Sequence, residues 1–250
     1  MSDLHVSYCL TGALDEGAIS AALNQLSPEE RARHARFRFA RDRRDFAVAH
    51  ALLRRALSAR FQLPPHDWTF VSGTHGKPRL DANLAARTHL SFNLAHTDGL
   101  VACIVTHDAD VGIDVEAIDR NTDALELARH YFSPSEIADL EQSAPDTRQV
   151  RFIEIWTLKE AFVKAVGDGL SCPLDTFGFV FDGPASLRFR ATDAVESASW
   201  CFALFAPSDR HRLAVAVRDP SRSARPHLER FEGVTGPREI VTSRALRSSW

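Results

Sequence analysis

The feature that most constrains the fold of this chain is an internal repeat of a helix–helix–strand unit. Residues 27–30 (Ser-Pro-Glu-Glu) and 133–136 (Ser-Pro-Ser-Glu) each combine an N-cap Ser, a Pro at the first helical position and a Glu at the third. Each start leads to a longer apolar stripe at helical spacing, over about 42–60 and about 147–166, and Gly167 provides a stop for the second. Corresponding points lie 106 to about 113 residues apart, which indicates a duplication.

Both halves continue with a Pro-containing turn and a pair of apolar strands. The sequence therefore predicts an α+β fold of two pseudo-symmetric lobes, each with helices packed on an antiparallel sheet, and a ligand cleft between the lobes. We expect an N-terminal lobe over 1–110, a C-terminal lobe with the metal motifs over 111–218, and a polar, loosely packed tail over 219–250. The paired strands are expected at 90–94, 100–105, 200–204 and 212–217.

The composition is that of a soluble globular protein, with 44% hydrophobic and 25% charged residues in a length of 250. The net charge of -3 excludes a generally basic nucleic-acid binder, and no apolar run approaches the ~18–20 residues of a membrane span. The first residues lack the pattern of a secretory signal, and the four cysteines lack metal-binding spacing. We expect a cytoplasmic protein with no nucleic-acid or membrane partner, for which a monomer suffices.

Lysine is scarce in this chain. Of the 30 Lys and Arg residues, only Lys77, Lys159 and Lys164 are lysines. One interpretation is that these three mark places where a compact ammonium is needed rather than a planar guanidinium. The alternative is that they are chance survivors of an Arg-rich composition.

Four residues of the second half combine into a candidate metal site. Asp114 and Glu116 are two apart on a predicted strand at 111–116, so their carboxylates share one face, which we expect to be exposed. Glu160 and Lys164 are four apart on the long helix and share a face too. The alternatives are a solvated strand edge and a surface ion pair. Together the three carboxylates favour a hard cation, best Mg²⁺, while no His or Cys stands at zinc-ligand spacing.

Basic residues in the first half suggest a phosphate-binding wall. Residues 75–79 (His-Gly-Lys-Pro-Arg) form a tight basic turn, and His96 is expected at a hairpin tip. The alternatives are a plain Gly-Pro turn and an exposed loop histidine. Acidic metal ligands beside a cationic wall indicate transfer or cleavage at a phosphoester or pyrophosphate.

Several of these motifs resemble a known family. Residues 111–116 (Val-Gly-Ile-Asp-Val-Glu), 156–164 (Trp-Thr-Leu-Lys-Glu-Ala-Phe-Val-Lys) and 167–170 (Gly-Asp-Gly-Leu) resemble the 4′-phosphopantetheinyl transferases of the two-lobed Sfp type. The upstream Gly76-Lys77-Pro78 and Asn93-Leu94-Ala95-His96-Thr97 match in order, and the likeness covers about residues 27–217.

The resemblance implies a reaction and roles for residues. The family moves the phosphopantetheine arm of coenzyme A onto a serine of an acyl or peptidyl carrier protein, releases adenosine 3′,5′-bisphosphate and needs Mg²⁺. Asp114, Glu116 and Glu160 resemble the metal ligands; Glu160 also resembles the residue that helps to deprotonate the serine, and Lys164 the one that stabilises the phosphate or leaving group. The residues that resemble coenzyme A contacts are Arg33, Lys77, Pro78 and His96, with Lys159 at the pyrophosphate.

The chain departs from the family at a few positions. Asp45 stands where the family often has an Arg, and Arg44 precedes it by one step, so either Arg44 reaches the 3′-phosphate from a shifted position or this contact is remodelled. Glu30 stands where some members have a Lys, and Ala95 replaces a common Ser. Two other functions stay open: a different Mg²⁺-dependent phosphoester enzyme such as a nuclease, and a non-catalytic binder of coenzyme A or nucleic acid on the Arg-rich face.

Overall fold

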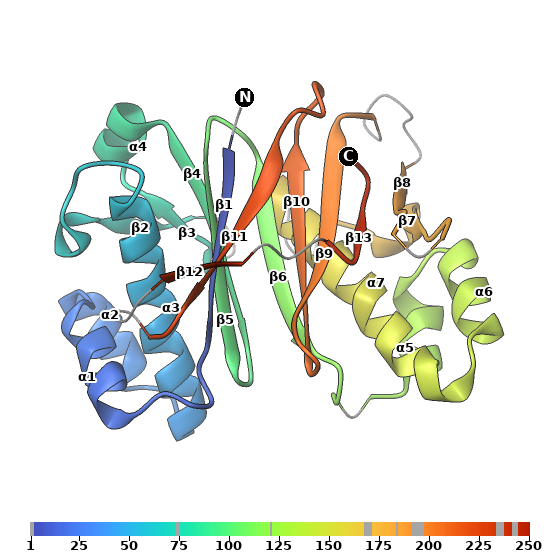
Figure 1. Ribbon diagram of the computed structural model, residues 1–250, viewed down its shortest axis with the longest axis horizontal. Coiled ribbons are helices and arrows are strands. Elements are labelled where there is room, and N and C mark those ends of the chain that lie inside the picture. Colours follow the sequence, from blue (N-terminus) through green and yellow to red (C-terminus); the bar gives the residue numbers. More distant parts are fainter. Residues whose placement is uncertain are drawn as a thin grey trace. The chain divides into compact units, whose positions relative to one another are not determined.

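The computed structural model describes residues 3–73, 76–120, 122–167, 172–183, 185–191, 198–233, 238–241 and 245–250 (Figure 1). The chain divides into two compact units. Unit 1 comprises Met1–Asp108 and Arg225–Thr242, and unit 2 comprises Ala109–Ala224 and Ser243–Trp250.

Unit 1 is a helical layer on a five-stranded sheet. The sheet order is β12-β11-β1-β5-β4, in which β1 and β11 are parallel and the other pairs antiparallel, and β2 and β3 form a separate hairpin. The helices are α1 (Glu16–Asn24), α2 (Pro28–His34), α3 (Ala40–Ser58) and α4 (Ala82–Thr88), with a 3-10 turn η1 (Pro65–Asp67). The strands are β1 (Asp3–Leu10), β2 (Phe70–Ser72), β3 (Pro78–Leu80), β4 (Leu90–Thr97), β5 (Leu100–His107), β11 (Arg225–Phe231) and β12 (Arg238–Val241).

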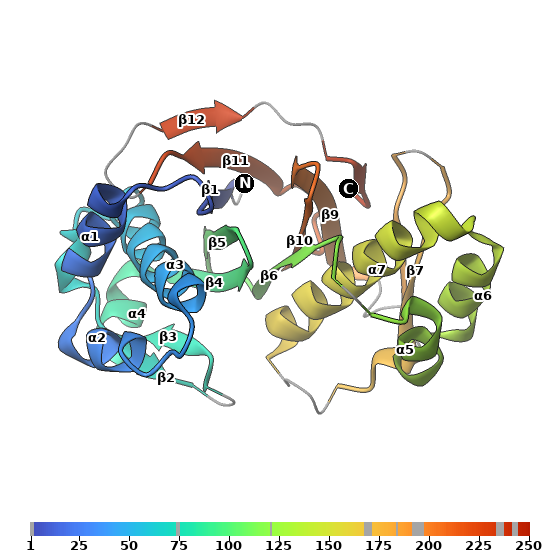
Figure 2. The ribbon, with the colours of Figure 1, turned by 90° about the horizontal axis from the view of Figure 1, so that it is seen from below.

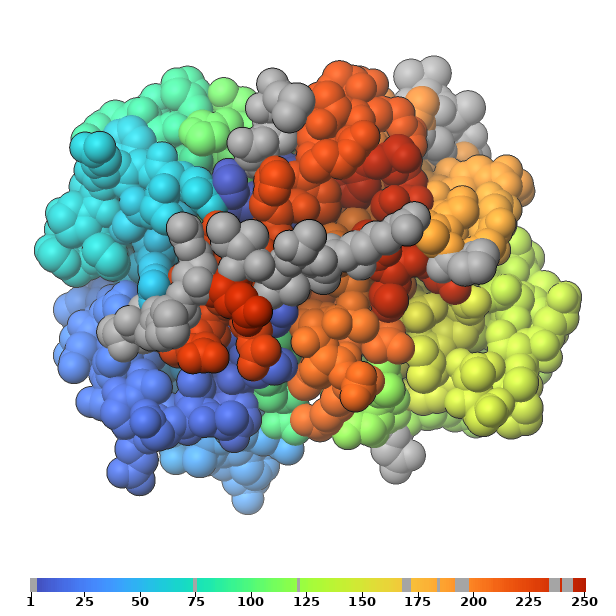
Figure 3. Space-filling view, viewed as in Figure 1, coloured from blue at the N-terminus to red at the C-terminus, as the bar shows by residue number. Residues whose placement is uncertain are grey.

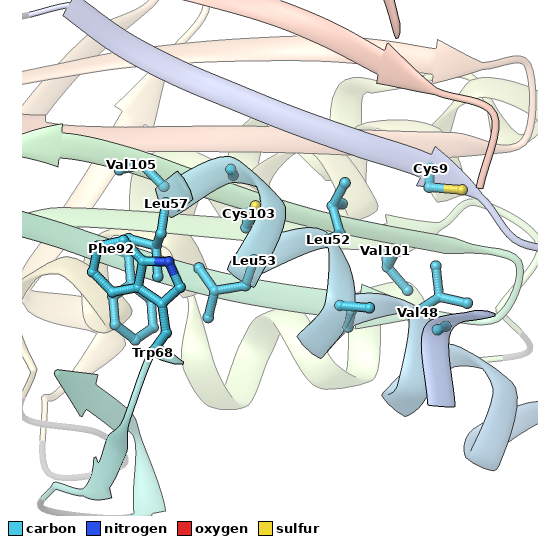
Figure 4. Close-up of a cluster of buried hydrophobic side chains, with 14 of the residues drawn as sticks. Cys9, Val48, Leu52, Leu53, Leu57, Trp68, Phe92, Val101, Cys103 and Val105 are labelled. Atoms are coloured by element: carbon cyan, nitrogen blue, oxygen red, sulfur yellow. The ribbon is translucent and has the colours of Figure 1, made fainter. Parts of the chain in front are cut away.

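The core of unit 1 lies between α3 and the sheet. The apolar positions of α3 recur at helical spacing, so one side of the helix is apolar and packs on β5, β4 and β1 (Figure 2). The close-up in Figure 4 shows this contact, with Leu52, Leu53 and Leu57 of α3 near Val101 and Cys103 of β5. All five of these side chains are buried, so this layer holds α3 in place.

Unit 2 repeats the arrangement on a four-stranded sheet of order β13-β9-β10-β6 with a separate β7-β8 hairpin. Its helices are α5 (Ala124–Tyr131), α6 (Pro134–Gln142) and α7 (Pro145–Val166), with a 3-10 turn η4 (Leu174–Thr176). Its strands are β6 (Val111–Ala117), β7 (Phe177–Val180), β8 (Arg188–Ala191), β9 (Trp200–Ser208), β10 (His211–Arg218) and β13 (Arg247–Ser248). Phe162 of α7 anchors the core, with ring centroids 4.7 Å from Phe177 and 5.0 Å from both Phe189 and Trp200.

The predicted duplication is confirmed in the order of the elements. The series β1, α1–α3, β2–β3, β4 and β5 corresponds to β6, α5–α7, β7–β8, β9 and β10. In both units the first and last strands of the series pair antiparallel: Tyr8 of β1 lies opposite Ala102 of β5, and Asp114 of β6 lies opposite Ala214 of β10. Both capping boxes form, and Gly167 ends α7 at a positive φ of 89°. The expected α+β architecture is therefore present in both units.

The structure corrects the prediction of a loosely packed tail over 219–250. β11 pairs in parallel with β1, β12 pairs with β11, and β13 pairs with β9. Leu228 and Phe231 of β11 are each only 4% exposed. In the space-filling view the dark red C-terminal segment lies beside the orange of β9 (Figure 3). The sequence did not reveal these strands because β11 carries mostly polar side chains and pairs with a strand more than 200 positions away.

The four cysteines are free thiols; Cys9, Cys103 and Cys201 are buried and Cys172 is half-buried. Among the described residues, no helix has the length and apolarity that a membrane crossing requires.

Candidate active site

The site is built where α7 lies directly on β6. Gly112, Asp114 and Glu116 alternate along β6 and share one face. A Cβ on Gly112 would lie 1.9 Å from the carbonyl oxygen of Ala161 and 2.6 Å from the nitrogen of Ala165. Only glycine therefore lets the α7 backbone approach β6 this closely, and this approach brings the helix beside the strand carboxylates.

Asp114 and Lys164 form the central contact of the site. The Lys164 ammonium donates to Asp114 Oδ1 at 2.6 Å, across the β6–α7 packing. Asp114 is 6% exposed, so the expectation that this carboxylate lies on an exposed face is wrong. The period of two placed the side chain on the correct face of the strand, but it could not show that α7 covers that face.

The carboxylates influence one another electrostatically. Burial, together with the charge of Asp114, raises the pKa of Glu116 to about 7. The same two causes, in the same order, raise the pKa of Glu160. Burial raises the pKa of Asp114 itself, and the nearby Lys164 charge opposes this shift. Burial and a neighbouring negative charge both disfavour the ionised form of a carboxyl group, and a bound cation would stabilise that form.

The fit of a metal ion can be judged from these donors. Asp114 Oδ2 is buried and has no hydrogen-bond partner in the described structure, so one carboxylate oxygen remains available as a ligand. No three carboxylate, imidazole or thiolate groups of the described residues are gathered as a preformed metal-binding group. Three neighbouring carboxylates that repel one another need not gather without a cation, and oxygen donors of this kind suit Mg²⁺. The residues therefore fit the metal that the sequence analysis expects.

Arg120 is a neighbour of the site that the sequence analysis did not identify. It follows β6, and its Nη1 donates to Glu116 Oε1 at 3.1 Å. Its guanidinium also lies 5.9 Å from the ring centre of Trp156, one turn before Glu160 on α7. The sequence feature that could have indicated Arg120 is its position just after the strand that carries Asp114 and Glu116.

The structure does not support the predicted pyrophosphate contact of Lys159. Its side chain is fully buried, and its Nζ lies 2.8 Å from Glu136 Oε2. The same ammonium donates to the carbonyl oxygens of Leu174 and Phe177, both at 2.7 Å. Three acceptors match the three hydrogens of an ammonium, so Lys159 is committed to the interior of unit 2.

Arg54 makes the equivalent set of contacts in unit 1. Its Nη2 donates to Glu30 Oε2 at 2.9 Å, and its Nη1 donates to the carbonyl oxygens of Pro65 and Trp68 at 3.0 and 2.7 Å. Glu30 and Glu136 are the capping-box glutamates of α2 and α6. Each repeat thus uses one buried cation to tie a long helix to the preceding helix and to the following turn. We call these two groups of contacts the cation locks.

The candidate coenzyme A contacts of unit 1 lie on several elements. Arg33 of α2 is exposed, with its guanidinium 5.5 Å from the ring centre of Phe46. His96 is exposed on β4, so the predicted hairpin tip lies just beyond it at the turn between β4 and β5. Pro78 begins β3, and Lys77 precedes it.

Arg44 lies on α3 and is linked to the same turn. Its Nη2 lies 3.9 Å from Asp98, which follows β4. Two segments of the predicted motifs, His75 and residues 168–170, lie outside the described residues.

Comparisons with known proteins agree with this architecture. The family model "4'-phosphopantetheinyl transferase superfamily" matches residues 110–216, and the model "4'-phosphopantetheinyl transferase, N-terminal" matches residues 15–108. A 4'-phosphopantetheinyl transferase of Bacillus subtilis is 28% identical over 83% of this chain and 88% of its own length. The transferase HetI of Nostoc is 32% identical over 77% of this chain and 78% of its own length.

The chain therefore belongs to the 4′-phosphopantetheinyl transferase superfamily. The transferase Sfp of Bacillus subtilis is 32% identical over 65% of this chain and 70% of its own length. The resemblance deduced from the sequence motifs is confirmed, and so is the enzyme class that it implied.

Proposed function

We propose that this protein transfers the 4′-phosphopantetheine arm of coenzyme A to a serine of an apo acyl or peptidyl carrier protein. The other product is adenosine 3′,5′-bisphosphate. The observation that carries the proposal is the contact of Lys164 on α7 with Asp114 on β6, with Glu116 and Glu160 close enough for the charge of Asp114 to raise their pKa values. Membership of the transferase family supports the same reaction.

The residues that would hold Mg²⁺ are Asp114, Glu116 and Glu160. Two observations support this set: Asp114 Oδ2 has no hydrogen-bond partner among the described residues, and the pKa values of all three carboxyl groups are raised. When bound, Mg²⁺ would offset the negative charge that grows on the pyrophosphate as its P–O bond breaks.

The chain's own side chains perform the proton and charge steps. Glu160 is assigned the role of accepting the proton of the carrier serine. Lys164 is 30% exposed at its side chain, so its ammonium can reach both Asp114 and a phosphate oxygen. A point charge here stabilises the negative charge of the departing nucleotide.

The nucleotide end of coenzyme A is proposed to contact residues of unit 1. An arginine offers a planar pair of donors to phosphate, and a lysine offers a point charge. The exposure of Arg33 and His96 is compatible with these contacts. The proposed contacts are Arg33, Arg44, Lys77, Pro78 and His96. A monomeric state and a cytoplasmic location remain predictions.

The test is intact-mass spectrometry of an apo carrier protein incubated with this protein, coenzyme A and Mg²⁺. We expect a mass gain of one phosphopantetheine group that disappears with EDTA and in the Asp114→Asn variant. Glu141→Gln on α6 is the matched control, because it makes the same carboxylate-to-amide change at a side chain that is 47% exposed.

The other outcomes separate the competing functions. Consumption of coenzyme A without a carrier would indicate a hydrolase. Binding of coenzyme A with no transfer to several carriers would indicate a binding protein. Either result would refute the proposed transfer.

A further inference from the structure

Asp45 is a buried carboxylate outside the metal site. It lies on α3 and is 3% exposed. Its Oδ1 accepts hydrogen bonds from Thr11 Oγ1 at 2.5 Å and from Arg44 Nε at 2.9 Å. Neighbouring residues of a helix do not normally face each other, so this contact turns the Arg44 guanidinium towards the next residue in the sequence.

These contacts place the guanidinium of Arg44 near the end of β1 and the turn between β4 and β5. Thr11 follows β1, and its backbone N–H donates to the carbonyl oxygen of Gly99 in the β4–β5 turn at 2.9 Å. Arg44 Nη2 lies 3.9 Å from Asp98 of the same turn, which is beyond hydrogen-bond distance. Asp45 therefore joins the end of β1, the start of α3 and the turn that follows His96.

The orientation leaves the outer edge of the guanidinium for another partner. Nε is engaged by Asp45, and the Nη groups of Arg44 make no hydrogen bond to a described residue. The Arg44 side chain is 22% exposed, so solvent and ligands can reach it. The two Nη groups of an arginine match two oxygens of one phosphate.

We propose that Asp45 is a positioning residue that holds Arg44 so that its Nη groups bind the 3′-phosphate of coenzyme A. The inference rests on the proposed function, because it assumes that coenzyme A is the donor. Asp45 itself touches no substrate. A fixed guanidinium loses less side-chain freedom when it binds, so the carboxylate increases the affinity for the phosphate although its own charge is negative.

The test compares two donors that differ by a single phosphate, coenzyme A and 3′-dephospho-coenzyme A. Transfer to one apo carrier protein is measured with each donor, and the preference is the ratio of the two kcat/KM values. Arg44→Gln should reduce the preference by roughly tenfold or more, because this is the loss expected when one hydrogen bond between charged groups is removed. Asp45→Asn should reduce it by a smaller factor, with the change in the KM for coenzyme A rather than in kcat.

Two control variants separate positioning from stability. Thr11→Val removes the other hydrogen bond to Asp45 and leaves Arg44 in contact with it, so it should lower the unfolding temperature without changing the preference. Asp98→Asn removes the neighbouring acid, whose Oδ1 lies 3.9 Å from Arg44 Nη2, an ion-pair distance without a hydrogen bond. Because Asp45 still holds Nε, this variant should keep the preference. An Asp45→Asn variant that is folded and keeps the full preference would overturn the proposal, and so would equal losses with both donors.

Failure of the proposed function would look different. In that case the wild-type protein transfers nothing from either donor. Calorimetric binding of coenzyme A and its dephospho form, without a carrier, then tests Asp45 alone. A wild-type preference that falls in Asp45→Asn supports the positioning role, and an unchanged preference refutes it.

Discussion

The replacement of Lys159 by Met gives the sharpest test of the cation locks. Methionine keeps the length of the side chain and removes the ammonium, so Glu136 loses its ion pair, and the carbonyl oxygens of Leu174 and Phe177 lose their donor. Removing one partner of a buried ion pair costs about 3–5 kcal/mol. For a chain of this size the unfolding temperature should fall by about 6–20 °C.

The assay combines urea unfolding with hydrogen–deuterium exchange. Exchange resolves the two units, so faster exchange in Lys159→Met should be confined to the elements that the lock joins, α6, α7 and β7. Arg54→Met is the matched control, because Arg54 makes the same contacts in unit 1. It should accelerate exchange in α2 and α3 and leave α6 unchanged.

The result also decides between two roles for Lys159. A pyrophosphate contact, as the family resemblance implied, predicts a raised KM for coenzyme A with little change in stability. A lock predicts the loss of stability with the KM of the folded protein close to that of the wild type. Unfolding within about 1 kcal/mol of the wild type, combined with a raised KM, would refute the structural reasoning.

Two further changes test other parts of the packing. Gly112→Ala should displace α7 and abolish transfer, since its Cβ would lie 1.9 Å from a backbone oxygen. Gly12→Ala is the control, because its Cβ would have nothing within 4 Å. A crystal structure of Gly112→Ala with α7 in place would contradict this prediction. Burial opposes the ionisation of Glu30, but the contacts from His50, Ser27 and Arg54 outweigh it and lower its pKa to about 2. The stability from Glu30 is therefore present above pH ~4.5 and is lost as the pH falls towards 2, so Glu30→Gln should flatten the unfolding free energy in that interval; equal acid sensitivity in both proteins would count against the shift.

Local and repeated features of the fold were accessible from the sequence. The capping boxes involve residues only three apart, so Ser27 and Ser133 marked their helices correctly. The spacing of Glu160 and Lys164, and the alternation of Asp114 and Glu116, also placed these side chains on the correct faces. These predictions depend on periodicity within one element.

Contacts between distant elements were not accessible in the same way. The pairing of β11 with β1 leaves no trace in local periodicity. The burial of Lys159 depends on carbonyl oxygens of a later turn, which no side-chain pattern announces. The family resemblance implied that Lys159 contacts the pyrophosphate of the substrate. A sequence motif gives the identity of a residue but not the groups that surround it in the fold.

The parallel pairing of β1 with β11 also affects how the protein is made. β1 ends at Leu10, whereas β11 begins at Arg225, so one edge of β1 lacks its partner until more than 200 further residues have been synthesised. At about 5–20 residues per second, that interval is on the order of 10–40 s. During this time the first strand presents an open edge on which another nascent chain can pair. We therefore expect the solubility of the newly made protein to depend on a segment that is synthesised more than 200 residues after β1.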